Sequence, residues 1–399
     1  MKIKYLDSIK IVSSFLLIFI VNSTLLLNHN LAYAAIPASK LYKITELKDK
    51  ASQNSSGVVR VIVQLNMGYK IEGELEEEED IEIQRTQIQE LQNNIIQSLA
   101  GENAQAYTKF RYIPHMALMV DEQALDAITL LDEVINIFES KFSDTSLSNS
   151  ATIIGRNQGS EYWTDDYYTG KGQAVAVIDT GIDIEHPYLA DRIISEACYS
   201  IHNPTSGLFS VCPNSVESST VSGSGDDCVY HENVAGYPDA ESFCQHGTHV
   251  AGIVAGQSND TSNDGVSTGA DIIAIQAGFL ELNPNKCPYD KLSCIKFDYS
   301  TLIESLERIY ELQNKELLNS TISAVNMSMG FNVDNCEEEA EPFIEIINNL
   351  KNLGVAVIAS SGNNGFRDGL KAPACLPNVI SVGATSNLNW FSDIVYEEK

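Results

Sequence analysis

The chain has 399 residues, enough for two domains or for one large core with an accessory module. It carries 25 Lys and Arg against 54 Asp and Glu, and the resulting formal net charge of −29 argues against binding the phosphate backbone of nucleic acids. Such a charge fits a soluble, self-repelling secreted protein.

The first 34 residues have the pattern of an export signal. A basic start precedes the apolar stretch IVSSFLLIFIV, and Ala32-Tyr33-Ala34 fits the small-x-small cleavage pattern. A retained membrane anchor is the alternative, but the apolar run falls short of the ~20 residues that a membrane span needs. We therefore expect a signal peptide over residues 1–34 and a secreted protein, extracellular or periplasmic, that does not stay in a membrane.

Residues 58–139 alternate between strand and helix patterns. The stretch VVRVIVQL (58–65) has the strand period, and the next segment, IEGELEEEED (71–80), is so acidic that we expect a solvated loop. Apolar residues at helical spacing follow from Ile88 to Leu99, and two strands, a helix and a final strand complete the series. The order β-α-β-β-α-β predicts a small α+β domain of the split βαβ kind.

Residues 140–150, SKFSDTSLSNS, are polar and Ser-rich, and they form the expected linker. Beyond them, short and nearly continuous apolar runs are typical of strands buried on both faces of a parallel sheet. Helices are predicted from Thr301 to Gln313, with a capping box at Thr301–Glu304, and from Pro342 to Gly354. Residues 151–399 should therefore be a domain of the α/β class with a mostly parallel sheet. The apolar runs are 173–179, 271–279, 324–331, 355–362 and 378–385.

All eight cysteines lie between Cys198 and Cys375. An even number confined to one region of an exported chain favours disulfide bonds over zinc, for which two close CxxC-type pairs would be needed. Topology predicts a Cys287–Cys294 bond within one loop and a Cys336–Cys375 bond at the carboxyl edge of the sheet. The other four cysteines would pair among themselves in a surface excursion that precedes His246.

Three polar residues follow or interrupt the apolar runs. Asp179 ends a strand, where catalytic groups of parallel sheets gather, although a turn-forming or capping role is equally open. His246 opens the helix HGTHVAGIVAG at its exposed first turn, whereas His249 is expected to be a satisfied core residue. Asn363, in SSGNNGF, could form a turn or could donate a hydrogen bond to an oxyanion.

The motifs VAVIDTGID, HGTHVAGIVAG and ASSGNNG, in this order, resemble the aspartate, histidine and oxyanion-asparagine blocks of subtilisin-like serine proteases (subtilases). The first half, including the stretch YIPHMALMV, resembles the inhibitory propeptide of the same family. The likeness covers roughly residues 58 to 392. It implies a subtilisin-like α/β fold with helices on both faces of a mostly parallel sheet, after a βαββαβ propeptide domain at 58–139.

The resemblance also implies roles for individual residues. His246 would be the general base, Asp179 would orient its imidazole, and Asn363 would supply an oxyanion-hole donor. Ser328-Met329-Gly330 looks like the strand that pairs with substrate and lines the specificity pocket with Gly362, although a plain core strand is the alternative. Calcium is frequent in the family, but no ligand set is readable. Protein or peptide substrates and the chain's own propeptide, as intramolecular inhibitor and chaperone, are the expected partners of a monomer.

The family's nucleophile block, Gly-Thr-Ser-Met-Ala, is absent from the sequence. We therefore expect a secreted serine endopeptidase zymogen by family, processed within residues 140–150, in a truncated form that is nearly inactive as written. One alternative is a non-catalytic protein that binds peptides or inhibits other subtilases, but the motifs around Asp179 and His246 are intact. A zinc hydrolase using His246 and His249 is a weaker alternative, because the glutamate of HExxH is missing.

Overall fold

The computed structural model describes residues 38–54, 56–145, 169–189, 191–229, 231–258, 264–288, 291–365 and 368–384. The expected signal peptide and the second part of the expected linker and processing region, residues 146–150, lie outside the described residues. Residues 46–399 form one unit, and residues 1–45 form another. No helix within the described residues is long and apolar enough to span a bilayer.

A seven-stranded sheet forms the framework of the C-terminal half, with the order β16-β15-β13-β6-β10-β7-β9. All neighbouring strands are parallel except β7 and β9. The predicted α/β fold with a mostly parallel sheet is confirmed. The strands are β6 (Gln173–Asp179), β7 (Ile193–Tyr199), β9 (Ser218–Ser219), β10 (Asp271–Gln276), β13 (Thr321–Met327), β15 (Ala356–Ser360) and β16 (Val379–Val382).

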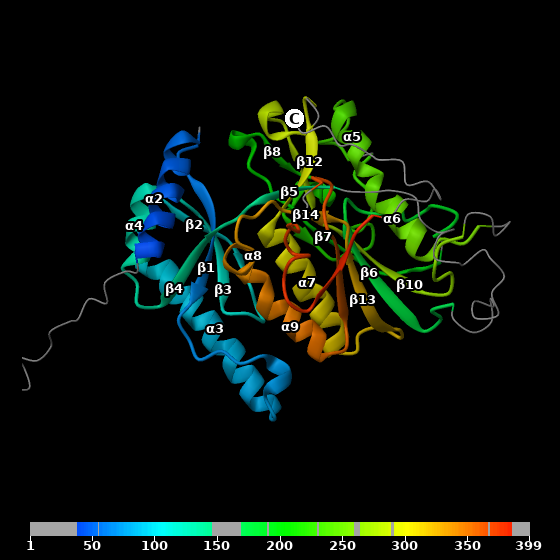
Figure 1. The fold of residues 1–399 in the computed structure, drawn as a ribbon, viewed down its shortest axis with the longest axis horizontal. Coiled ribbons are helices and arrows are strands. Elements are labelled where there is room, and N and C mark those ends of the chain that lie inside the picture. The colour runs from blue at the N-terminus through cyan, green and yellow to red at the C-terminus, as the bar shows by residue number, and fades with distance from the viewer. Residues whose placement is uncertain are drawn as a thin grey trace, which may run out of the picture. The chain divides into compact units, whose positions relative to one another are not determined.

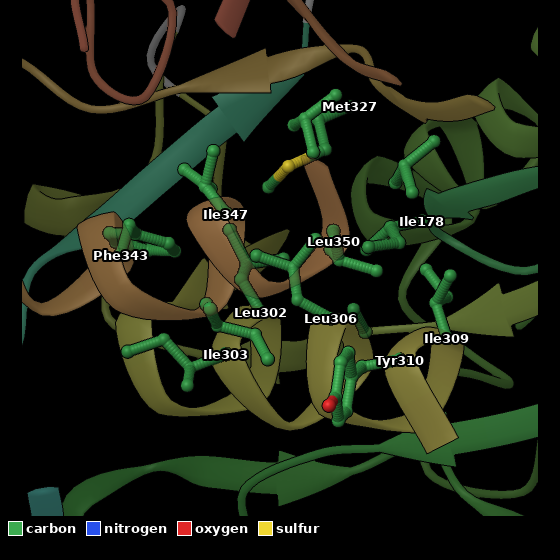
Figure 2. Close-up of a cluster of buried hydrophobic side chains, with 14 of the residues drawn as sticks. Ile178, Leu302, Ile303, Leu306, Ile309, Tyr310, Met327, Phe343, Ile347 and Leu350 are labelled. Atoms are coloured by element: carbon green, nitrogen blue, oxygen red, sulfur yellow. The ribbon is translucent and has the colours of Figure 1, made fainter. Parts of the chain in front are cut away.

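Helices cover both faces of this sheet (Figure 1). On one face, α6 (His246–Ala255) buries its apolar side against Val177 of β6. On the other, α7 (Tyr299–Asn314) and α9 (Ile344–Asn352) lie side by side and pack on Ile178. Because successive strand residues face opposite ways, Val177 and Ile178 enter different cores. Figure 2 shows the second core, where side chains of α7 and α9 meet those of β6 and β13.

The N-terminus of α7 differs from the prediction. The helix begins at Tyr299 and is capped by Asp298, whose side chain accepts a hydrogen bond from the backbone N–H of Ser300 at 2.9 Å. Thr301, the predicted cap, is the third helical residue, and its hydroxyl donates to the carbonyl of Ala277 at 2.9 Å. The capping box therefore exists, but it is made by Asp298 and Thr301.

An N-terminal module, residues 59–139, contains an antiparallel four-stranded sheet of order β2-β3-β1-β4. Its elements follow the predicted order β-α-β-β-α-β. Ile62 and Phe138 from this sheet belong to the same buried cluster as α7 and α9. The elements are β1 (Val59–Leu65), α3 (Glu78–Ser98), β2 (Ala104–Lys109), β3 (His115–Val120), α4 (Glu122–Thr129) and β4 (Val134–Glu139).

The acidic segment 71–80 is largely exposed, as predicted, but it is not a loop throughout, so that part of the prediction is wrong. It contains a short 3₁₀ helix, η1 (Glu72–Glu74), and the start of α3. Glu72 is buried and takes two hydrogen bonds from Arg85, at 2.8 and 2.6 Å, and one from the hydroxyl of Tyr310 at 2.7 Å. A charge can be buried when it is paired in this way, which composition alone did not indicate.

A second, five-stranded sheet has the order β14-β5-β12-β11-β8, with every pair antiparallel. Its strand β5 (Phe142–Thr145) lies in the segment expected to be an irregular linker, so the linker prediction is wrong for these four residues. The other strands are β8 (Leu208–Ser210), β11 (Gly278–Glu281), β12 (Cys294–Asp298) and β14 (Met329–Gly330). The remaining elements are α2 (Ala38–Gln53), η2 (Pro204–Ser206), η3 (Pro213–Ser215), α5 (Pro238–Cys244), η4 (Pro284–Lys286), α8 (Cys336–Glu339) and η5 (Glu341–Phe343).

The eight cysteines form four pairs at bonding distance. Cys287 pairs with Cys294, and Cys336 pairs with Cys375 across a separation of 39 residues. The other two pairs, Cys198–Cys212 and Cys228–Cys244, precede His246. All four are intrachain links within the C-terminal half.

We predict that non-reducing peptide mapping of the oxidised protein recovers these four linked peptide pairs. The physical reason is that the two Cα atoms of each pair lie 5.0–6.1 Å apart, within the range that a disulfide spans, so oxidation requires no backbone movement. The Cys336 peptide is the most informative one. Its recovery as an alkylated thiol, or its linkage to any cysteine other than Cys375, would contradict the pairing.

Candidate active site

Asp179 and His246 meet at the carboxyl edge of the parallel sheet. Asp179 is the last residue of β6 and is fully buried, while His246 is the first residue of α6, with its side chain 9% exposed. The Nδ1 atom of His246 lies 2.7 Å from Oδ1 of Asp179. The backbone N–H of Thr180 donates to the same oxygen at 2.7 Å. These bonds fix the orientation of both side chains.

The close approach of α6 to β6 depends on Thr180 and Gly247. The Thr180 hydroxyl donates to the carbonyl of Cys244 at 2.9 Å and accepts from the N–H of Gly247 at 3.1 Å. A Cβ at position 247 would overlap the carbonyl oxygen of Gly181 and would lie 3.1 Å from Cβ of Asp179. The Cys228–Cys244 pair links the residue two before His246 to another loop. The start of α6 is thus held against the end of β6.

His249 does not share this environment. It lies one turn into α6 and is exposed, so the expectation of a satisfied core histidine is wrong. The buried residues of the helix are Gly247, Val250, Ala251 and Ala255. The exposed face of α6, and not its core face, carries this second histidine.

The predicted oxyanion and substrate residues follow the two strands next to β6. In the order β15-β13-β6, parallel strands end at one edge, so the segments after β13 and β15 lie on the same side as Asp179. Met329, after β13, is fully buried, and its carbonyl accepts from the hydroxyl of Ser360 at 3.4 Å. Asn363, after β15, is exposed. The edge therefore gathers the predicted residues, although only Asp179 and His246 are shown in direct contact.

Lys371 packs on both glycines that were predicted to line the specificity pocket. A Cβ added to Gly330 would lie 2.8 Å from Cβ of Lys371, and one added to Gly362 would lie 2.8 Å from its Cγ and Cδ. Gly362 also has φ +105°, a value that side-chain-bearing residues rarely adopt. Lys371 is 9% exposed and its N–H donates to the carbonyl of Ser361 at 3.2 Å. The aliphatic stem of this lysine therefore fills the space beside both glycines.

Strand β5 lies between β12 and β14 in the second sheet. Thr145 opposes Met329 and Asp144 opposes Gly330, while Ser143 opposes Phe297 on the other side. Both pairings are antiparallel. A segment of the chain thus occupies the backbone hydrogen-bonding positions beside the predicted substrate strand.

The N-terminal module contacts α7 through buried polar groups. The carboxylate of Glu307 accepts hydrogen bonds from the N–H groups of Arg111 and Tyr112, at 3.1 and 2.7 Å. Burial raises the pKa of Glu307 to about 7, against the effect of these two donors. Burial also raises the pKa of Glu304, one turn earlier, to about 8, and the charge of Glu307 adds to the rise.

His115 of the module is fully buried between two carboxylates of the C-terminal half. Its Nε2 lies 3.5 Å from Glu341, and its Nδ1 lies 3.1 Å from Glu345. Burial lowers the pKa of His115, but the nearby carboxylates of Glu341 and Glu345 outweigh burial and raise it to about 9. The two carboxylates therefore favour the protonated form of the imidazole where the module contacts η5 and α9.

Metal binding has little support in the part of the chain that the structure describes. No group of three or more His, Cys, Asp or Glu side chains there is placed to hold an ion. Calcium, which is frequent in the family, therefore stays an expectation from the resemblance.

Residues 170–395 match the model of the subtilase family, Peptidase_S8. The chain belongs to the subtilase family. It is 27% identical over 237 residues to the thermophilic serine proteinase of Bacillus sp. (strain AK1), across 57% of this chain and 44% of that protein. It is 23% identical over 294 residues to subtilisin amylosacchariticus of Bacillus subtilis subsp. amylosacchariticus, across 73% of this chain and 61% of that protein.

Among solved structures, the epidermin leader peptide processing serine protease of Staphylococcus aureus matches with a TM-score of 0.48 at 14% identity, over 82% of this chain and 69% of that chain. The chain spans less than two thirds of the length of both curated subtilase relatives.

Sequence reasoning missed Thr180, Lys371 and strand β5, which border this site. Thr180 sits inside the aspartate motif, but its role as a bridge to α6 needs the fold. Lys371 lies eight residues after Asn363 with no motif around it. Strand β5 lies in a Ser-rich segment whose composition gives no strand pattern. Only for Thr180 did the sequence carry a signal, namely its position directly after Asp179.

Proposed function

We propose that the protein is a serine endopeptidase of the subtilase family, made as an exported precursor. The observation that carries the proposal is the 2.7 Å contact between Nδ1 of His246 and Oδ1 of the buried Asp179. A buried carboxylate bonded to Nδ1 holds the imidazole in one tautomer and stabilises the imidazolium that forms during the reaction. No observation favours a non-catalytic binding role.

The proposed mechanism assigns each group one task. Because Nδ1 of His246 carries its hydrogen toward Asp179, Nε2 is the nitrogen that accepts the proton of a nucleophilic serine. Asn363 would donate to the oxyanion that forms on the attacked carbonyl. None of the described serines is assigned the nucleophilic role. The substrate would be an extended peptide paired with Ser328, Met329 and Gly330.

We propose further that the N-terminal module is an intramolecular inhibitor and folding aid. The supporting observation is that β5, which follows the module directly, occupies the strand position beside β14 where substrate would bind. An occupied position of this kind blocks access until the segment is cut. Cleavage within residues 146–150, just after β5, would release the module, and residues 1–34 would direct export.

Maturation tests this proposal. The protein is expressed with a family-type C-terminal segment that carries the Gly-Thr-Ser-Met-Ala block. The new N-terminus is sequenced after incubation. We expect a cut within residues 146–150 and release of the module. An intact chain after prolonged incubation, with no hydrolysis of added casein, would remove the support for endopeptidase activity.

Lys371→Ala is expected to change the preference for the residue before the scissile bond. Removing the four-carbon stem opens the space beside Gly330 and Gly362, so larger side chains should enter. An apolar pocket discriminates between substrates by about ten-fold or more for one methylene group of difference. We expect the ratio of kcat/KM for Phe over Ala at that peptide position to rise about ten-fold. Lys351→Ala, at an exposed lysine, is the control. An unchanged ratio in the Lys371 variant would show that this lysine does not limit the pocket.

A further inference from the structure

We propose that Gln276 is a positioning residue of the catalytic pair, and that its side-chain amide donates a hydrogen bond to the second carboxylate oxygen of Asp179. The inference rests on the proposed function, because it takes Asp179 as the residue that orients His246. It starts from two buried polar atoms, Oδ2 of Asp179 and Nε2 of Gln276, which have no hydrogen-bond partner among the described residues. Both side chains are fully buried.

Asp179 and Gln276 lie opposite each other at the carboxyl ends of neighbouring strands. Strands β6 and β10 are parallel and adjacent (Figure 1), and their last residues, Asp179 and Gln276, are register partners. The N–H of Ala277 donates to the carbonyl of Asp179 at 2.9 Å, and Thr180 forms a β-bridge with Gln276. Because neighbouring strands lie about 4.8 Å apart, this pairing holds the two residues close together.

The two side chains also point to the same face of the sheet. Val177 of β6 and Ala274 of β10 belong to the buried cluster that α6 covers. Because side chains alternate between the two faces of a sheet, the residues two positions later, Asp179 and Gln276, lie on that same side. It is also the side on which His246, the first residue of α6, meets Asp179.

The orientation of the Gln276 amide makes its nitrogen the available donor. Oε1 of Gln276 accepts a hydrogen bond from the backbone N–H of Gly278. Exchanging the amide oxygen and nitrogen would set an NH₂ group against that N–H, so this bond fixes the assignment. The register partner on the other side, Cys198 of β7, is bonded to Cys212 and offers no strong acceptor. Of the two register partners, Asp179 is therefore the one that presents an oxygen.

The catalytic carboxylate has room for this donor because its other partners share one oxygen. Nδ1 of His246 and the N–H of Thr180 both contact Oδ1 of Asp179, each at 2.7 Å. An ionised carboxylate can accept about four hydrogen bonds, and such bonds favour its charged form. A donor on Oδ2 would fix the plane of the carboxylate and keep Oδ1 toward the imidazole. The terminal torsions of Asp and Gln are broad, so the bond closes without backbone movement.

A double-mutant cycle tests whether the two side chains interact. The full chain, Gln276→Met, Asp179→Ala and the double variant are unfolded with urea. A bond from Nε2 to the carboxylate makes the two losses non-additive, and we expect a coupling of about ten-fold or more in the unfolding equilibrium constant. If Gln276 served only to hold Gly278, its loss would cost the same with and without Asp179. Additive losses would therefore overturn the proposal.

Proton NMR spectroscopy of the full chain shows whether the contact positions the catalytic pair. The hydrogen on Nδ1 of His246, held against Asp179, should give a low-field signal in the unchanged chain. We expect Gln276→Met to weaken this signal, because Oδ1 is then no longer held toward the imidazole. Gln257→Met, at an exposed glutamine of the same half, is the matched control and should leave the signal unchanged. An unaltered signal in the Gln276 variant would contradict a positioning role.

A measurement on the unchanged chain keeps the proposal testable if Gln276→Met fails to fold. In protein that is isotope-labelled at its glutamines, the Nε2 signal of Gln276 is identified by its proximity to the N–H of Gly278. One of the two Nε2 protons should lie at low field and should shift as His246 titrates, because it bonds to the carboxylate that faces the imidazole. Two protons with the shifts of an exposed glutamine amide would overturn the bond.

Kinetics give the catalytic readout. In an active, matured form, Gln276→Met should lower kcat about ten-fold or more and leave KM unchanged, because the side chain is buried beneath α6 and acts only through Asp179. A full kcat in this variant, or a change confined to KM, would overturn the positioning role. A coupled, low-field pair in a protein that shows no hydrolysis at all would instead count against the proposed peptidase activity and leave the bond from Gln276 standing.

Discussion

His246→Ala is expected to lower the rate of self-processing and of peptide hydrolysis by about 10⁴–10⁶-fold in a form that carries the nucleophile. That range is the one known for triad deletions in subtilisin and related proteases. The reason is that Nε2 of His246 is the proposed proton acceptor, held by the 2.7 Å bond from Nδ1 to the buried Asp179. The measurement is the appearance of the processed N-terminus over time, together with kcat/KM on a peptide.

Two further variants make this result specific. His249→Ala removes the other histidine of the same helix, which is exposed, and should leave processing unchanged. Asp179→Asn keeps the shape of the side chain, but its amide favours the wrong tautomer of His246, and a loss of about 10⁴-fold is expected. Normal maturation of the His246 variant would mean that another group is the base.

The residues at the carboxyl edge of the sheet were predictable because their signals are local. The apolar run that ends at Asp179 marks a buried strand, and the Gly/Ala-rich segment after His246 marks a closely packed helix. The cap of α7 was misplaced by three residues because Thr301 and Glu304 satisfy a local pattern. The observed cap depends on Asp298, at the end of a strand that the sequence did not reveal.

Strand β5 and the buried Glu72 could not be predicted for a different reason. The partners of β5, such as Phe297 and Met329, lie more than 150 residues away in the chain. A short polar strand also shows no alternation of apolar and polar residues by which the sequence could reveal it. Glu72 is stabilised by Tyr310 and Arg85, so its burial depends on the contact between two segments that are distant in sequence. The contact between the N-terminal module and the C-terminal half is therefore a tertiary property.

The same contact should weaken as the pH rises. His115 keeps its proton in the docked state, where its pKa is about 9, whereas an exposed histidine releases it near 6.5. Its contribution is therefore complete below pH 6.5 and is lost as the pH rises through 9. The pKa values of Glu304 and Glu307 are about 8 and 7 in the docked state, so these groups also bind protons on docking. Docking of these two carboxyl groups is therefore also favoured at low pH and weakens as the pH rises.

We expect the inhibition constant of the module toward the matured peptidase to be about 100-fold or more higher at pH 9 than at pH 6. The reason is linkage: each unit by which docking raises the pKa of a group makes docking of the protonated group ten-fold stronger. Inhibition constants of the released module measured at several pH values between 5 and 9 give the slope directly. His115→Gln removes the titrating cation between Glu341 and Glu345, so the slope should flatten by about one proton while the effect of the α7 carboxylates persists. His249→Gln, at the exposed histidine of α6, should leave the slope unchanged. Tighter inhibition at pH 9 than at pH 6 would show that the charged carboxylates, and not their protonated forms, are favoured in the contact.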